Sequence, residues 1–123
     1  MARRLGVRAP SLYEYVEGRD ALIRLLIAVG LDELGTALVA ATPSDASALD
    51  RMHAIADGYI DFALRCPALF SLALGPCPDA HVVDAIHGER ASAPLLEAVA
   101  AIAPEERQLN AAQSLWSLVH GYV

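Results

Sequence analysis

The sequence contains no lysine, so all nine of its basic residues are arginines. It has only two cysteines, Cys66 and Cys77, which lack both the paired spacing of a metal site and the number that a disulfide framework requires. Two thiols within the core of a cytoplasmic protein are therefore expected. The longest apolar runs, at residues 25–31 and 98–103, are too short to cross a membrane, and no secretory signal follows the basic start.

Groupings that would indicate catalysis are also missing. The serines lack the glycine-flanked elbow of a hydrolase, and no phosphate-binding glycine loop is present. The single Asp-x-x-His segment at residues 84–87 is not the paired motif of a di-iron bundle. His53, Asp57 and Asp61 have a spacing that can place metal ligands on one helix face, but a solvated edge with Asp61 paired to Arg65 is favoured. We expect no enzyme, no cofactor and no metal site.

Apolar residues are abundant, at 55% of the 123 residues, and the mean hydropathy is +0.38. This surplus over the needs of a small core indicates either a buried partner interface or an internal ligand cavity. Charge is unevenly distributed: residues 1–24 hold five arginines against three acidic residues, and the remainder holds four against twelve. The asymmetry favours an anion-binding segment attached to an acidic body, with chance clustering as the alternative.

Apolar spacing and helix-breaking residues predict an all-α chain, since no segment shows the alternation of a β-strand. Gly6 is expected to end a first helix, and Ser44 is a plausible N-cap. The expected helices are residues 9–16, a long helix from about Asp20 to Ala41, residues 45–65, residues 67–74 ending at Gly75, residues 79–101 with an interruption near Gly88 and a possible break at Pro94, and a last helix from near Pro104 to the end.

The first 24 residues have the pattern of a helix-turn-helix, because two short helices joined by a glycine turn precede a long helix. Small residues at the start of the second helix would let its backbone approach base edges, and donors on both flanks would reach phosphates. Arg8 and Ser11 are predicted to contact base edges, and Ala9 and Pro10 are predicted to contact a thymine methyl group. The predicted phosphate-binding residues are Tyr13, Tyr15 and Arg19, the last at a helix start where the dipole assists.

The segment LGVRAPSLYEYVEGRDAL resembles the signature of the tetracycline-repressor (TetR) family. Residues 5–7 match the turn, Pro10 matches a proline of the tetracycline repressor itself, and residues 12–13 match the Leu-Tyr pair. Arg19 stands where the family has a phosphate-binding lysine, whereas Tyr15 replaces the usual histidine. The resemblance implies a DNA-binding function for this segment.

The tail, LWSLVHGYV, resembles the Trp-…-His-Gly segment of a C-terminal regulatory domain in such repressors, with Trp116, His120 and Gly121 at matching positions. The resemblance therefore implies a DNA-binding region at residues 1–24 and a helical ligand-binding and dimerisation domain at residues 25–123. Family members are longer and carry helices before the turn and after the tail. We accordingly expect a chain truncated at both ends.

These observations predict a cytoplasmic homodimeric repressor that binds a double-stranded DNA operator. By resemblance, a small apolar effector would tilt the long helix and separate the two DNA-binding heads. Aromatic rings with a polar tip would suit such an effector, although the alternative, that these rings simply fill the core, is favoured. The alternative function is a truncated dimerisation or ligand-binding module without working DNA binding. The candidate effector residues are Tyr59, Phe62, Phe70, Trp116 and His120.

Overall fold

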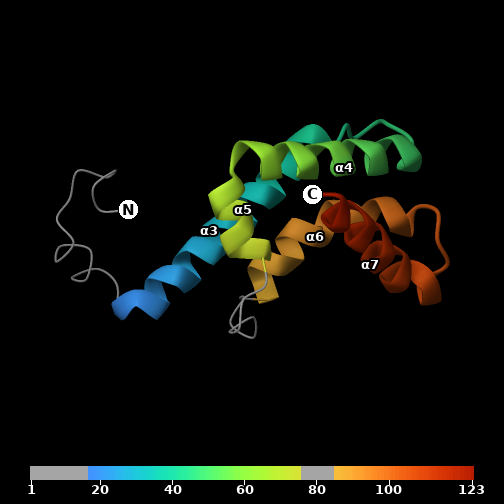
Figure 1. Ribbon diagram of the computed structural model, residues 1–123. Helices are drawn as coiled ribbons and strands as arrows, with labels where there is room; N and C mark the ends of the chain where they lie inside the picture. Colours follow the sequence, from blue (N-terminus) through green and yellow to red (C-terminus); the bar gives the residue numbers. More distant parts are fainter. Residues whose placement is uncertain (1–16, 76–84) are drawn as a thin grey trace.

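Helices account for nearly all of the structure, a computed structural model that describes residues 17–75 and 85–123. These residues form five helices, α3 to α7, and contain no strand (Figure 1). The predicted all-α fold is confirmed for this part of the chain.

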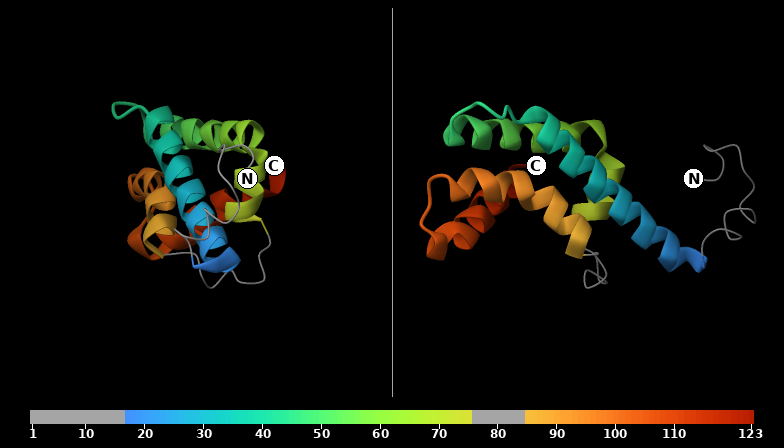
Figure 2. Two further views of the ribbon diagram at one scale, coloured as in Figure 1. Left: turned by 90° about the vertical axis from the view of Figure 1, so that its left-hand side faces the viewer. Right: turned by 180° about the vertical axis from the view of Figure 1, so that it is seen from behind.

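Helix α3 (Gly18–Ala41) packs against α4, α5 and α6. Its buried stripe, Ile27, Leu31, Leu34 and Leu38, follows the helical spacing of three and four residues, and the last two are fully buried. The N-terminal part of α3 extends away from the other helices (Figures 1 and 2). Residue 24, the end of the predicted DNA-binding region, lies within α3.

Helix α4 (Ala48–Arg65) begins later than predicted, because Ser47 and not Ser44 is its N-cap. The Ser47 hydroxyl oxygen accepts a hydrogen bond from the Asp50 amide at 3.2 Å and donates to the Asp50 carboxylate at 2.7 Å. Ser44 lies in a turn of the preceding loop, one helical turn too early to reach these groups. The predicted Asp61–Arg65 pair is confirmed, with nitrogen and oxygen 3.8 Å apart.

Helices α5 (Pro67–Leu74) and α7 (Glu105–Tyr122) agree with the prediction. Helix α6 (Ala85–Ala100) does not, because it continues through both Gly88 and Pro94. A proline inside a helix removes one backbone hydrogen bond. Burial of the α6 face that carries Ala91, Leu95, Ala98 and Val99 compensates for this loss.

The approach of α3 to α6 is especially close at Gly35. A Cβ at this position would lie 3.3 Å from the Arg90 carbonyl oxygen. Arg90 is four residues before Pro94, which has no N–H, so its carbonyl lacks the usual helical donor. Glycine at position 35 thus leaves room for the backbone of α6 where Pro94 has freed a carbonyl group.

The core combines side chains from α3, α4 and α6 with one buried alanine of α7. Ion pairs lie at its periphery: Arg51–Glu97, with 3.5 Å between nitrogen and oxygen, joins α4 to α6, and Asp32–Arg90, at 3.8 Å, joins α3 to α6. Such solvent-exposed pairs contribute little to stability. No helix in the described part of the chain is both long and apolar enough to cross a membrane.

Candidate ligand cavity between α4, α6 and α7

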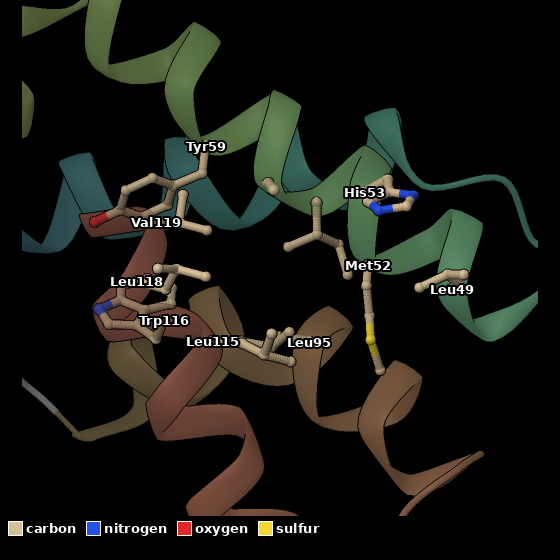
Figure 3. Close-up of a pocket in the computed structure, with 11 residues that line it drawn as sticks. Leu49, Met52, His53, Tyr59, Leu95, Leu115, Trp116, Leu118 and Val119 are labelled. Atoms are coloured by element: carbon tan, nitrogen blue, oxygen red, sulfur yellow. The ribbon is translucent and has the colours of Figure 1, made fainter. Parts of the chain in front are cut away.

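A cavity of about 250 Å³ lies between α4, α6 and α7 (Figure 3). Helix α4 contributes residues at intervals of three and four, which place them on its inner face. Helix α7 provides most of the opposite wall, and α6 contributes one leucine. The lining residues are Leu49, Met52, His53, Ile55, Ala56, Tyr59, Leu95, Leu115, Trp116, Leu118 and Val119.

The two ends of the cavity differ in their exposure to solvent. At one end the Tyr59 and Trp116 rings meet edge to face, with centroids 4.8 Å apart, and Tyr59 is only 2% exposed. Leu49, at the His53 end, is 59% exposed, and Leu118, beside Trp116 at the aromatic end, is 71% exposed (Figure 3). His53 is likewise exposed and lies towards the opposite end of α4 from Tyr59 (Figure 3). Aromatic rings thus line one end of the cavity, and the end near His53 is open to solvent.

Tyr59 also contacts two residues that do not line the cavity. Its hydroxyl oxygen lies 2.7 Å from Nδ1 of His120, and the Phe70 ring packs edge to face on it with centroids 5.4 Å apart. Burial raises the pKa of the Tyr59 hydroxyl above its ordinary value of 10.0. The phenol therefore keeps its proton at neutral pH and can donate it to an unprotonated Nδ1.

The structure brings four of the five predicted effector residues together, in what we call the aromatic cluster. Tyr59 and Trp116 line the cavity, while Phe70 and His120 support Tyr59 from α5 and α7. Phe62 is apart from them: it belongs to the core and borders a depression formed largely by α3 residues.

Sequence reasoning did not single out the other lining residues, and it assigned His53 to a solvated edge. His53, Asp57 and Asp61 are all exposed as expected, and His53 in addition lies beside Met52 and borders the cavity. Leu49, Met52, Ala56 and Tyr59 recur at helical spacing and mark the inner face of α4. Because His53 directly follows Met52, this apolar stripe could have indicated from the sequence that His53 lies at the edge of the inner face.

Most predicted DNA-binding residues, namely Arg8, Ala9, Pro10, Ser11, Tyr13 and Tyr15, lie outside the residues that the structure describes. Arg19 lies in the first turn of α3 and is exposed to solvent. Within residues 17–75 and 85–123, no three His, Cys, Asp or Glu side chains come together as potential metal ligands.

The cavity-lining helices coincide with a recognised domain. A family model described as "Tetracyclin repressor-like, C-terminal domain" matches residues 52–123, more than half of the chain. The chain belongs to this family. The tetracyclin repressor-like domain begins within α4, continues to the end of α7 and contains the segment with Trp116, His120 and Gly121. No curated protein matches the chain. Membership of this family indicates a transcription regulator.

Proposed function

We propose that the protein is a transcriptional repressor that binds a double-stranded DNA operator and is released by a small effector in the cavity. The observation that supports this proposal is an apolar cavity, lined at one end by an aromatic cluster, within a tetracyclin repressor-like C-terminal domain. Pockets that bind small molecules are typically concave and apolar with a few polar groups. DNA contacts are assigned to the N-terminal residues, with Arg19 as the contact that lies in α3.

The path from cavity to DNA runs through α5. Phe70 of α5 contacts Tyr59, and the same helix packs against α3, where a Cβ on Gly30 would lie 3.0 Å from Ala73 Cβ and 3.1 Å from Leu69 Cδ1. An effector that displaces the Tyr59 ring would move α5, and α5 cannot move towards α3 without tilting it. The switch is an equilibrium between two arrangements of α3. Effector binding in the cavity shifts this equilibrium, and the arrangement of α3 determines DNA binding.

Two copies of the chain would read two half-sites of an operator, as helix-turn-helix dimers do. Exposed apolar side chains on α7, including Leu109, Leu118 and Tyr122, supply surface that such an interface could bury. We accordingly propose a homodimer, acting in the cytoplasm where it meets its DNA.

DNA binding is tested by the mobility of a random-sequence duplex at low salt. Arg19→Ala should weaken binding to every duplex and reduce the salt dependence by about one phosphate contact, because an exposed cation at the start of α3 is lost. Arg65→Ala is the matched control, since it removes an equal charge from the far end of α4. Equal salt slopes for Arg19→Ala and the unmodified protein would show that Arg19 contacts no phosphate.

Arg8→Ala tests base recognition and should relax the preference at one base position by about 1–3 kcal/mol. A uniform loss across sequences would make Arg8 a positioning contact.

The second candidate function is a helical dimerisation or ligand-binding module without working DNA binding. It is favoured if the protein shifts no duplex yet elutes as a dimer in gel filtration. In either case Trp116, the chain's single tryptophan, lines the cavity and should report a bound effector by its fluorescence.

A further inference from the structure

The cavity offers a ligand very few polar groups. Of the lining side chains, only those of His53, Tyr59 and Trp116 carry a nitrogen or oxygen atom. The Tyr59 hydroxyl is engaged by His120, and Figure 3 shows this oxygen and the Trp116 ring nitrogen at the ends of their rings far from His53. Within the described residues, no hydrogen bond or ion pair engages the His53 side chain. His53 is therefore the unengaged polar side chain at the open end of the cavity.

An anionic ligand is disfavoured at both ends of the cavity. No Asp, Glu, Lys or Arg lines it, so an ionised group near Tyr59 would be buried without a partner. Burying an unpaired charge is strongly unfavourable. At the open end, Asp50 and Asp57 lie one turn before and after His53 on α4 and are exposed, so a carboxylate placed there would face two others. The part of a ligand near Tyr59 is therefore expected to carry no charge, and a negative charge is disfavoured at the open end as well.

The dimensions indicate how large the ligand is. A cavity of about 150 Å³ holds one benzene ring, and drug-sized ligands occupy pockets from about 300 Å³ upwards. The observed volume of about 250 Å³ lies between these sizes. Along α4, His53 and Tyr59 are six residues apart, or about 9 Å at the helical rise. This span suits a compound of two fused rings with a polar group at one end.

We propose that His53 selects and orients the effector: an uncharged bicyclic compound whose single hydroxyl group hydrogen-bonds to the imidazole at the open end. Its rings extend from there between α4 and α7 to the Tyr59 and Trp116 rings. The inference rests on the proposed function, because it specifies the ligand of the same cavity. It assigns a binding role to His53, which the sequence had placed on a solvated edge.

Calorimetric titration of the full chain with three related probes tests this assignment at neutral pH. The probes are 2-naphthol, which carries the hydroxyl; naphthalene, which lacks it; and 2-naphthoate, which carries a charge. We expect 2-naphthol to bind about tenfold more tightly than naphthalene, corresponding to one hydrogen bond of about 1.4 kcal/mol. The binding of 2-naphthoate should be weaker than that of 2-naphthol by at least a similar factor.

Variants at position 53 separate the hydrogen bond from the apolar contacts. In His53→Leu the advantage of 2-naphthol over naphthalene should disappear while naphthalene still binds, and His53→Gln should restore part of the advantage. Asp61→Asn, on the same helix but outside the cavity lining, is the control and should leave all affinities unchanged. Circular dichroism of each variant checks that the helical fold is retained.

The outcomes distinguish this inference from the proposed function. If 2-naphthoate binds as tightly as 2-naphthol, or the hydroxyl preference survives in His53→Leu, the role of His53 is overturned while the cavity remains a ligand site. If no probe binds and Trp116 fluorescence does not change, the effector site itself is overturned together with this inference.

Discussion

The hydroxyl oxygen of Tyr59 lies 2.7 Å from Nδ1 of His120 and so joins α4 to the last turn of α7. Tyr59 is also the central ring of the aromatic cluster, in contact with Phe70 of α5 and Trp116 of α7. One side chain thereby links three helices at the aromatic end of the cavity. Changes at this residue should affect both the stability of the fold and the shape of the ligand site.

Removing the Tyr59 hydroxyl should destabilise the protein. Tyr59→Phe keeps the ring and its edge-to-face contacts but deletes the hydrogen bond to His120, so we expect a loss of about 0.5–1.5 kcal/mol in unfolding free energy. Urea unfolding measures it. Tyr122→Phe is the matched control, because Tyr122 is 80% exposed and should show no change. Similar losses in the two variants would contradict a stabilising hydrogen bond at Tyr59.

The raised pKa of Tyr59 makes stability depend on pH in the alkaline range. The unfolded chain releases this proton near pH 10.0, whereas the folded protein holds it to higher pH. The associated stability is complete below that pH and falls as pH rises above it, by at most about 1.4 kcal/mol per unit. Urea unfolding between about pH 9 and pH 11 should show a steeper decline for the unmodified protein than for Tyr59→Phe. Parallel curves would exclude this linkage.

The two serines before α4 provide a comparison of caps. Ser47→Ala removes the side-chain oxygen that accepts the Asp50 amide hydrogen bond and should cost about 0.5–2 kcal/mol. Ser44→Ala, in the preceding turn, should change the unfolding free energy by less than about 0.5 kcal/mol. The melting temperatures of the two variants test the difference. A larger effect of Ser44→Ala would show that Ser47 is not the N-cap.

Two helical glycines should respond oppositely to an added side chain. At Gly35 a leucine would press into the Arg90 backbone, so Gly35→Leu should destabilise the protein by about 1–3 kcal/mol. At Gly88 no atom of the described residues lies within 4 Å of the added Cβ, so Gly88→Ala should stabilise α6 by about 0.5–1 kcal/mol. Chemical denaturation distinguishes them, and a tolerated leucine at position 35 would show that α3 and α6 can separate there.

The positions of the described helices followed largely from apolar spacing, prolines and glycines. The continuation of α6 through Pro94 did not, because it depends on burial against α3, which a local pattern does not contain. Likewise Ser44 and Ser47 are equivalent as residue types, and only the loop geometry decides which one reaches the Asp50 amide.

The candidate site was predictable in part. Trp116 and His120 were expected to share a face of α7, and both contact Tyr59. The sequence could not separate Phe62 from the cluster, because α4 has apolar residues on two faces and only the fold shows which one meets α3. The assignments at residues 8–15 stay predictions based on the motif and its family resemblance.

The tight fit between α3 and the α6 backbone has a mechanical consequence. If α3 tilts, as the proposed switch requires, we expect Gly35 to be the pivot, because α3 lies against the Arg90 backbone there. Gly30, where α5 presses on α3, is about 7.5 Å from the pivot along the helix, and Arg19 is about 24 Å from it. A displacement of α3 at Gly30 would then be amplified about threefold at Arg19. A shift of half an ångström at Gly30 would move Arg19 by more than an ångström.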